Sequence, residues 1–314
     1  MKVSVVIPAY NSEHLIIEAI ESVYNQTADP CYQLHEVIVV DDGSSDRTEE
    51  VIGAYKETGQ RDSLHYIKQS NGGPSAARNA GLLRATGELI ALLDADDLWM
   101  PDKLKLQVAG FQTNLGAGIV YGQFINRVYK KNGEFFEYPV VKCFYKGDIK
   151  KELLRCNFIG TSTVMIKREV VARIGLFNTE LRLAEDYDYW LRIADCYSAA
   201  YCEIPILMKR YYGDQNVSGG RSLKMLMSTR DVVSSHLHSL NQAERSDVLK
   251  AQDISEIQTY ILLGDRAKAF RKIAASKTSG LSKLKYGLLA LVPMKWINYL
   301  IFRRNMRIIT KISR

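Results

Sequence analysis

The sequence predicts an α/β protein in which helices cover both faces of a mostly parallel sheet, followed by a helical C-terminal extension. Three observations lead to this prediction. Short apolar runs alternate with helical patterns through the first hundred residues, acidic clusters directly follow two of these runs, and turn residues become scarce after residue 222. Parallel strands joined by crossover helices account for this alternating order.

Composition agrees with one sizeable globular domain and a smaller appendage. The 314 residues are 46% hydrophobic and 25% charged, which excludes a disordered chain and a collagen-like repeat. The five cysteines are odd in number and show no CxxC spacing, which argues against a structural zinc site and a fully paired secreted framework. The apolar run at 3–7 is too short for a signal peptide, so we expect a reduced, cytoplasmic protein.

The first hundred residues contain four expected strands, at 3–7, 36–40, 64–68 and 88–93. Three helices join them. Asn11 or Ser12 is expected to cap the first helix, while Asp46 and Glu49 fit a cap and its third-position partner for the second. Pro74 suits the first turn of the third helix.

The pattern changes after residue 101. A helix at 102–112 leads to aromatic, strand-like stretches at 118–126 and 134–145, which indicate a mixed or antiparallel extension of the sheet. Further expected elements are helices at 149–155, 167–174 and 185–194 and a strand at 199–212. From 222 to 277 the chain reads as helical, and we place the domain boundary between 218–220 and 223.

Two acidic clusters stand at the C-terminal ends of expected strands, where ligands of such sheets bind. Asp94 and Asp96 follow an apolar strand end, and two carboxylates so placed can hold Mg²⁺ or Mn²⁺ against phosphate oxygens. Asp41 and Asp42 follow the second strand, where a carboxylate can accept hydrogen bonds from a nucleobase or ribose. The alternative for both clusters is a structural role in turns and caps.

Glycine-rich phosphate motifs are missing. The sequence contains no GxxxxGK[ST] and no GxGxxG after the first strand. A metal and Arg or Lys side chains would therefore have to meet the charge of a diphosphate. Arg78, on the helix that begins at Pro74, is the best-placed candidate, and the alternative is an exposed helix arginine.

Five segments in this order resemble the family 2 glycosyltransferases, over about residues 1–220. They are VVIPAYN at 5–11, VVDDGSSD at 39–46, NGG at 71–73 with ARNAG at 77–81, LDADD at 93–97 and EDYDYWLR at 185–192. The resemblance implies the Rossmann-like nucleotide-diphosphosugar transferase fold, the glycosyltransferase A type. It also implies transfer of a sugar, with inversion, from a nucleotide sugar to a hydroxyl of a glycan or lipid-linked acceptor in cell-surface polysaccharide synthesis. The nucleotide sugar in this family is commonly a UDP-sugar, and the implied metal is Mg²⁺ or Mn²⁺.

The resemblance also implies a role for each matching residue. On the donor side these are Pro8 and Tyr10 at the base pocket, Asp42 on the base with Asp41 supporting it, Arg78 beside the nucleotide, Asp94 and Ala95 at the ribose, and Asp96 with Asp94 at the metal. Asp186 matches the general base that takes the acceptor proton, with Glu185 beside it. We expect Asp186 to stay ionised near its helix start; the alternative is a helix-start acid before core aromatics.

The chain departs from the family at one point. Many relatives carry a His shortly before the Asn-x-Ser that closes the domain, whereas the run from 210 to 218 has none. Arg210, Tyr211 or Tyr212 would serve the phosphate instead, or the metal has fewer protein ligands.

Positive charge is concentrated at the end of the chain. Residues 262–314 hold 13 Lys and Arg and one acid, Asp265. The apolar run at 286–302 is interrupted and too short for a confident membrane span, but with its flanking cations it predicts an interfacial helix on an anionic membrane surface. An ordinary docking helix is the alternative; we expect no nucleic-acid partner, because no recognisable module accompanies the charge.

The expected organisation is a glycosyltransferase domain at 1–220 and a basic, membrane-associating helical region at 221–314. Within the first, 1–100 would bind the nucleotide and 101–220 the acceptor, at the inner face of the cell membrane. The leading hypothesis is a metal-dependent hexosyltransferase-type enzyme. The alternatives are a non-catalytic glycan or membrane adaptor on the same scaffold and a nucleotidyltransferase, which would need a Gly-rich, Lys-bearing first loop that is missing.

Overall fold

The computed structural model describes residues 1–59, 62–130, 132–139, 145–212 and 222–292. The chain forms two compact units, one of Met1–Ile149 with Phe158–Gly213 and one of Lys150–Asn157 with Asp214–Arg314. The predicted boundary at 218–220, the end of the strand predicted at 134–145, the Asn-x-Ser at 216–218 and the tail beyond 292 lie outside the described residues. All four cysteines in the described part of the chain are free thiols.

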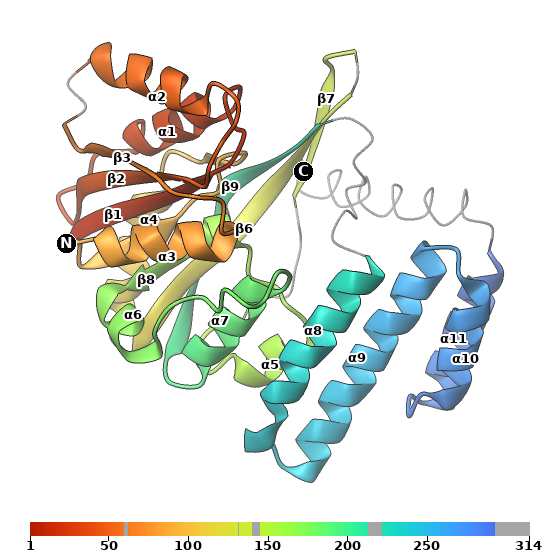
Figure 1. Ribbon diagram of the computed structural model, residues 1–314. Coiled ribbons are helices and arrows are strands. Elements are labelled where there is room, and N and C mark those ends of the chain that lie inside the picture. The colour runs from red at the N-terminus through yellow and green to blue at the C-terminus, as the bar shows by residue number, and fades with distance from the viewer. Residues whose placement is uncertain (60–61, 131, 140–144, 213–221, 293–314) are drawn as a thin grey trace, which may run out of the picture. The chain divides into compact units, whose positions relative to one another are not determined.

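The first unit is a sheet with helices packed against it (Figure 1). Its strands are β1 (Lys2–Ala9), β2 (Gln33–Asp41), β3 (Leu64–Lys68), β4 (Leu89–Leu92), β5 (Leu98–Trp99), β6 (Ala117–Tyr129), β7 (Phe135–Pro139), β8 (Met165–Lys167) and β9 (Ser198–Tyr212). Its helices are α1 (Ile16–Tyr24), α2 (Thr48–Glu57), α3 (Pro74–Arg84), α4 (Lys103–Thr113), the 3-10 turn η1 (Thr161–Thr163), α6 (Arg168–Ile174) and α7 (Glu185–Ala194). The predicted strand–helix order of the first hundred residues is confirmed.

The sheet is mixed, with strand order β3-β2-β1-β4-β8-β6-β9-β5 and β7 paired to β6. β1 runs parallel to β2 and β4, and β2 runs parallel to β3, as predicted. β8 lies antiparallel to β4 and β6, and β5 antiparallel to β9, whereas β6 and β9 are parallel. This second part is the mixed extension that the sequence indicated. The C-terminal ends of β1, β2 and β4 share one edge, which brings their loops together.

Successive side chains of β1 pack on opposite faces of the sheet. Val5 and Ile7 join the core formed with α1, α2 and α4, where Ile16 is fully buried. Val6 faces the other side, toward α3. A Cβ on Gly81 of α3 would lie 2.2 Å from Val6 Cγ1, so only glycine permits this close approach of helix to sheet. The packing fixes where α3 presents its polar side chains.

The cap predicted for the first helix is wrong, because the loops after β1 and β2 bond to each other. Neither Asn11 nor Ser12 caps α1, which begins at residue 16; Asn11 Oδ1 accepts a hydrogen bond from the Ser45 backbone N–H at 2.9 Å. Asp46 Oδ1 accepts a hydrogen bond from the Thr48 backbone N–H at the start of α2, at 3.0 Å, but Glu49 is not its partner and pairs with Lys68. Asp46 Oδ2 also accepts from a backbone N–H of the loop after β1, at 3.0 Å. Two loops at the same sheet edge are thereby joined.

The second unit is helical, as predicted. It contains α5 (Lys150–Arg155), α8 (Leu223–Ser235), the 3-10 turn η2 (Leu237–Ser239), α9 (Gln242–Leu262), α10 (Arg266–Ala275) and α11 (Gly280–Leu291). Ile257, Ala269 and Tyr286, from α9, α10 and α11, meet in its core. Asn241 and Glu244 form a capping box at the start of α9. Among the described residues, no helix combines the length and the apolar character needed to cross a membrane.

Candidate active site

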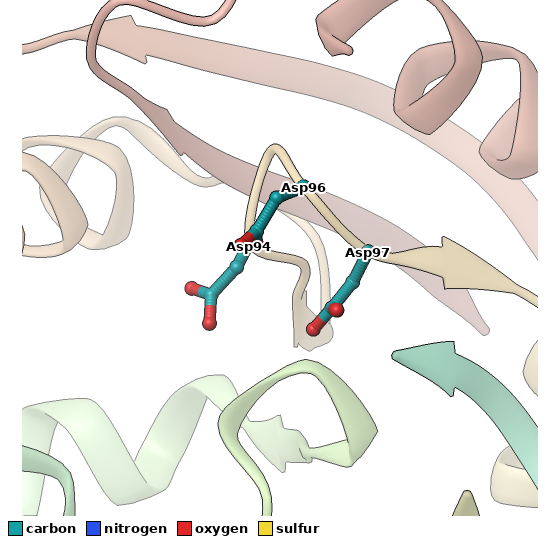
Figure 2. Close-up of side chains that lie close together, drawn as sticks. All are labelled: Asp94, Asp96 and Asp97. Carbon is teal, nitrogen blue, oxygen red and sulfur yellow. The ribbon is translucent and has the colours of Figure 1, made fainter. Parts of the chain in front are cut away.

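Three aspartates project from one tight turn after β4 (Figure 2). One carboxylate oxygen each from Asp94, Asp96 and Asp97 lies within 4.8 Å of the other two. The turn is closed by a hydrogen bond from the Asp97 N–H to the Asp94 carbonyl, at 3.0 Å. The sequence analysis proposed Asp94 and Asp96 as metal ligands; the structure brings Asp97 to the same place.

The oxygens of this turn suit a hard divalent cation. The pKa of Asp97 is raised to about 7, first by burial and then by the charges of Asp96 and Asp94, against the opposing effect of Lys209. Burial and then the neighbouring Asp94 also raise the pKa of Asp96. Asp97 Oδ1 is buried and has no hydrogen-bond partner among the described residues. A cation such as Mg²⁺ or Mn²⁺ would relieve this repulsion and occupy the unpaired oxygen, so the residues present fit the predicted metal.

Arg78 joins the acidic turn to the start of α7. Its guanidinium donates to Asp94 Oδ1 at 2.9 Å and to Glu185 Oε1 at 3.0 Å. The Arg78 side chain is buried, which excludes the alternative of an exposed helix arginine. Burial alone would lower the pKa of Arg78, but Asp94 and Glu185 outweigh it and raise the pKa. For Asp94, burial would raise the pKa, and Arg78 outweighs burial and lowers it. Segments 107 residues apart therefore form one ion cluster.

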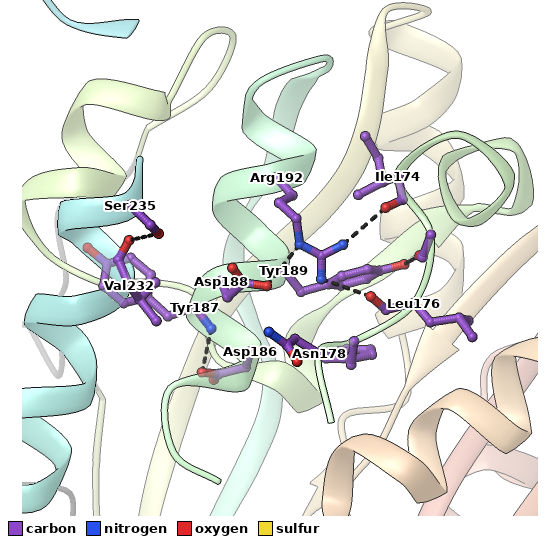
Figure 3. A network of polar contacts seen from close by, with 12 residues as sticks. Ile174, Leu176, Asn178, Asp186, Tyr187, Asp188, Tyr189, Arg192, Val232 and Ser235 are labelled. Carbon is purple, nitrogen blue, oxygen red and sulfur yellow. Dashed lines mark hydrogen bonds and ion pairs between the residues drawn. The ribbon is translucent and has the colours of Figure 1, made fainter. Parts of the chain in front are cut away.

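Asp186 follows Glu185 in the first turn of α7 (Figure 3). Its Oδ1 accepts a hydrogen bond from the Tyr187 N–H at 2.6 Å, and its Oδ2 accepts one from Thr161 Oγ1 at 3.2 Å. Burial and then Glu185 raise the pKa of Asp186, against the opposing effect of Arg78. Burial therefore outweighs any lowering of the pKa by the helix N-terminus, and ionisation of Asp186 at neutral pH stays a prediction. A raised pKa makes the ionised carboxylate a stronger base.

Arg192 fixes α7 in its orientation (Figure 3). It pairs with Asp188 one turn earlier, at 2.8 Å, and donates to the carbonyls of Ile174 at 3.0 Å and Leu176 at 2.8 Å. The two bonds to these carbonyls hold the helix against the end of α6 and the loop after it. The position of Asp186 is thus set by the scaffold rather than by a free loop.

The predicted base-binding aspartates shape the loops around them. Asp41 accepts hydrogen bonds from the Ser44 N–H at 2.8 Å and the Tyr66 hydroxyl at 2.6 Å. Asp42 accepts from the backbone N–H groups of Gly72 at 2.9 Å and Gly73 at 2.8 Å, and from a glutamine amide. A carboxylate has about four acceptor sites, so one remains on Asp42 for a ligand.

Pro8 and Tyr10 lie at the same sheet edge. Pro8 is paired with Val40 in the register of β1 and β2, and Tyr10 is 53% exposed just beyond the end of β1. Gly43 turns the neighbouring loop with φ at +77°, and a Cβ there would lie 3.0 Å from the Asn71 backbone nitrogen. The structure places both residues beside the aspartates at 41 and 42.

Lys209, which the sequence analysis did not select, faces the acidic turn from β9. Leu98 pairs with Met208 across the antiparallel β5–β9 ladder, so the next positions along, Asp97 and Lys209, are opposite each other. Burial alone would lower the pKa of Lys209, but Asp97 and other groups of the cluster raise it. Its ammonium group makes no hydrogen bond or ion pair with any residue that the structure describes. It is a fixed positive charge beside three carboxylates.

The three residues that were expected to contact phosphate in place of the missing His have other contacts. Arg210 is buried, donates from Nε to the Asp96 carbonyl at 2.7 Å and pairs with Glu18 of α1, so it supports the acidic turn and is not free for phosphate. Tyr212 stacks on Tyr129 with ring centroids 4.7 Å apart. Tyr211 has its ring 6.0 Å from the Lys209 ammonium.

The turn η1 supports both acidic groups. Ser162 donates to Asp97 Oδ2 at 2.7 Å and accepts from the Asp94 N–H at 3.0 Å, while Thr161 contacts Asp186. No motif in the sequence marks this turn. Three consecutive hydroxyl residues at 161–163, all buried between apolar neighbours, were the available signal.

Lys103, a buried lysine, contacts η1, and its burial leads us to expect that the stability of the fold depends on pH. Lys103 of α4 donates to Gln107 Oε1 and to the Thr163 carbonyl. Burial lowers the pKa of Lys103 to about 7 from its ordinary 10.5. Between pH 7 and pH 10.5, the Lys103 side chain is therefore protonated in the unfolded chain and neutral in the folded chain. We expect the free energy of unfolding to rise with pH in this window, by at most about 1.4 kcal/mol per pH unit.

Denaturant unfolding at pH 7, 8 and 9 measures this slope. We expect the slope to be lost in Lys103→Met and kept in Lys105→Met, which changes a half-exposed lysine of the same helix. An equal slope in wild type and Lys103→Met would show that other groups cause it.

The sequence matches the model of Glycosyl transferase family 2 over residues 4–175. It is 32% identical over 247 residues to the amylovoran biosynthesis glycosyltransferase AmsB of Erwinia amylovora, covering 74% of this chain and 78% of that protein. It is also 33% identical over 193 residues to an uncharacterized glycosyltransferase of Rickettsia felis, covering 62% of this chain. That match spans only 30% of the Rickettsia protein.

Solved structures share the fold of this chain. S. aureus TarS 1–349 in complex with UDP-GlcNAc superposes with a TM-score of 0.62 at 21% identity, covering 88% of this chain and 84% of that one. The mannosyltransferase PcManGT of Pyrobaculum calidifontis, in complex with GDP-Man and Mn²⁺, gives a TM-score of 0.60 at 20% identity and covers 94% of this chain and 87% of that one. The fold is of the glycosyltransferase A type, with a mixed sheet and C-terminal helices, as predicted.

Proposed function

Because the chain belongs to glycosyl transferase family 2, we propose that it transfers a sugar from a UDP-sugar to a hydroxyl group of a glycan or lipid-linked acceptor, with inversion and with the help of Mg²⁺ or Mn²⁺. The reaction would serve the synthesis of a cell-surface polysaccharide, as the name of its Erwinia amylovora relative suggests. The UDP-GlcNAc complex of TarS and the GDP-Man and Mn²⁺ complex of PcManGT are in keeping with a nucleotide-sugar donor and a metal.

One observation carries this proposal: Arg78 holds Asp94 of the acidic turn and Glu185 of α7 within hydrogen-bonding distance of the same guanidinium. The candidate metal-binding turn and the candidate base Asp186, which directly follows Glu185, are therefore neighbours, as the chemistry of sugar transfer requires. The leaving diphosphate must be stabilised on one side of the sugar, and a carboxylate must meet the acceptor on the other.

The residues then divide the work as follows. Asp42 binds the base, with Asp41 holding its loop and with Pro8 and Tyr10 lining the pocket. Asp94 and Ala95 contact the ribose, while Asp94 and Asp96, joined by Asp97, hold the cation, whose charge would stabilise the leaving diphosphate. Arg78 orients Asp94 and Glu185, and Asp186 accepts the proton of the acceptor hydroxyl. A single displacement on one face of the sugar inverts its configuration and needs no covalent intermediate.

We assign catalysis to residues 1–220, with the donor on 1–100 and the acceptor on 101–220. We assign attachment to an anionic membrane surface to 221–314, which would place the enzyme peripherally on the inner face of the cell membrane. The concentration of positive charge after residue 262 supports this second assignment.

Lys209 is expected to bind the leaving diphosphate. Its ammonium group faces the acidic turn and has no ion-pair partner among the described residues, so a phosphate oxygen would complete its contacts. We expect Lys209→Met to weaken UDP binding roughly 30-fold and to change uridine binding little. Calorimetric titration with UDP and with uridine measures both.

Lys224→Met, in the second unit, is the matched control for Lys209→Met. An equal loss of UDP and uridine affinity in Lys209→Met would mean that the substitution disturbs the whole pocket. Unchanged UDP affinity would remove Lys209 from the donor site.

The function itself is tested by titrating the wild-type chain with UDP, GDP, CDP and dTDP, with and without Mn²⁺. We expect tight binding of UDP that depends on Mn²⁺. If the folded chain binds none of these nucleotides, the enzyme hypothesis fails and the non-catalytic adaptor takes its place. Release of pyrophosphate from the donor, in place of a nucleoside diphosphate, would instead identify a nucleotidyltransferase.

A further inference from the structure

Helix α11 has one buried and one exposed apolar face. Tyr286 and Ala290 pack into the core of the second unit. On the other side, four leucines are 60–83% exposed, and we call them the leucine stripe: Leu281, Leu284, Leu288 and Leu291. Their spacings of three, four and three residues place them along one line of the helix surface. A soluble surface rarely leaves such a row in water without a partner.

The charges around the stripe are all positive. From residue 266 to the end, the chain holds 13 Lys and Arg and no acidic residue. Lys285 is exposed and adjoins Leu281 and Leu288, which are four residues before it and three after it on the helix surface. Lys283 lies away from the stripe and donates to the Ala274 carbonyl at 3.1 Å. Arg266 and Arg271 are exposed on α10, which packs with α11 in the same core. The partner of this surface must therefore be both apolar and negatively charged.

We propose that α11 lies flat on an anionic phospholipid surface, with the leucine stripe among the acyl chains and Lys285 at the headgroup phosphates. An apolar face beside cations is what such a helix needs, and α11 is already folded and anchored by Tyr286 and Ala290. This inference rests on the membrane attachment included in the proposed function, and it names the surface that makes the contact.

A second copy of the chain would fit the stripe less well. The leucine spacing is that of a coiled-coil seam, but α11 has 12 residues, fewer than two heptads, whereas stable seams run over several. Pairing two copies would also bring positive charges together with no acidic residue on α11 to oppose them. An anionic lipid surface meets both the apolar and the charge requirement.

Co-sedimentation of the full chain with phosphatidylcholine vesicles, with and without phosphatidylglycerol, tests the proposal. We expect binding only with phosphatidylglycerol, and weakening as salt rises. The triple variant Leu281→Ser/Leu284→Ser/Leu288→Ser should bind about 100-fold more weakly. The matched control Met227→Ser/Leu249→Ser, which removes exposed apolar side chains of α8 and α9, should bind like the wild type.

Two outcomes would overturn the proposal. If the triple variant binds vesicles as tightly as the wild type, the leucine stripe is not the contact. If the wild type ignores vesicles and is a dimer in solution that the triple variant dissociates, the partner is a second copy. UDP binding is measured on the same samples. Its retention when vesicle binding fails would leave the glycosyltransferase proposal standing, and its loss would count against that proposal separately.

Discussion

Replacing Asp186 with asparagine is expected to lower kcat for sugar transfer about 1000-fold, because the amide cannot take the proton of the acceptor hydroxyl. Asparagine keeps a carbonyl oxygen that can accept the hydrogen bonds from Thr161 or Tyr187, so the start of α7 should stay in place. Donor affinity should change little, since the base acts on the acceptor. Initial rates at saturating donor, together with calorimetry of UDP binding, measure the two quantities.

The pH profile adds a second readout. Burial and Glu185 raise the pKa of Asp186 above its ordinary 3.8, so as pH falls the wild type should lose activity at a higher pH than an ordinary aspartate would allow. The residual activity of Asp186→Asn should lack this acidic limb. Asp195→Asn, at the exposed end of the same helix, is the matched control and should keep both rate and profile. Full activity in Asp186→Asn would exclude it as the base.

Replacing Asp96 with asparagine is expected to abolish the stimulation of UDP binding by Mn²⁺ and to lower kcat/KM roughly 1000-fold. Asp96 is the most exposed of the three aspartates in the turn, and its backbone carbonyl, rather than its side chain, holds Arg210. The substitution should therefore remove a metal ligand without loosening the turn. Titration of UDP at several Mn²⁺ concentrations gives the coupling between metal and nucleotide.

Asp102→Asn supplies the comparison for Asp96→Asn, because Asp102 is an exposed aspartate that makes no cap bond at the start of α4. Its Mn²⁺ dependence should match the wild type. A chelator should reduce the wild type to the level of Asp96→Asn and leave that variant unchanged. If Mn²⁺ stimulates Asp96→Asn as strongly as the wild type, Asp96 does not hold the metal. If neither protein responds to Mn²⁺, the transfer is independent of metal.

The order of elements could be predicted from the sequence because each strand and helix has its own local pattern. β3 has the predicted bounds, 64–68, and α3 begins at Pro74 as predicted. What could not be predicted depends on contacts between distant segments. β5 is two residues long and is defined by its pairing with β9. The parallel pairing of β6 with β9 joins two strands that lie far apart in the sequence, at 117–129 and 198–212.

The candidate site divides in the same way. Residue type and position at strand ends were enough to select Asp94 and Asp96. Arg78 was selected as a cation on the helix that begins at Pro74, and the structure joins Arg78 to Asp94. Lys209 was missed because its importance depends on the register of β9 against β5, which places it opposite Asp97. The raised pKa of Asp186 was not predicted, for a related reason. A helix start is visible in sequence, whereas the burial that outweighs it is not.

The double contact of Arg78 would couple the binding of the donor to the binding of the acceptor. In the roles proposed above, one guanidinium serves Asp94 on the donor side and Glu185 on the acceptor side, so any ligand that draws Asp94 away would change the hold on Glu185. Occupation of the two half-sites is then thermodynamically linked. If the nucleotide sugar and its cation strengthen acceptor binding by some factor, the acceptor must strengthen donor binding by the same factor. Such reciprocity would favour formation of the ternary complex over futile hydrolysis of the donor.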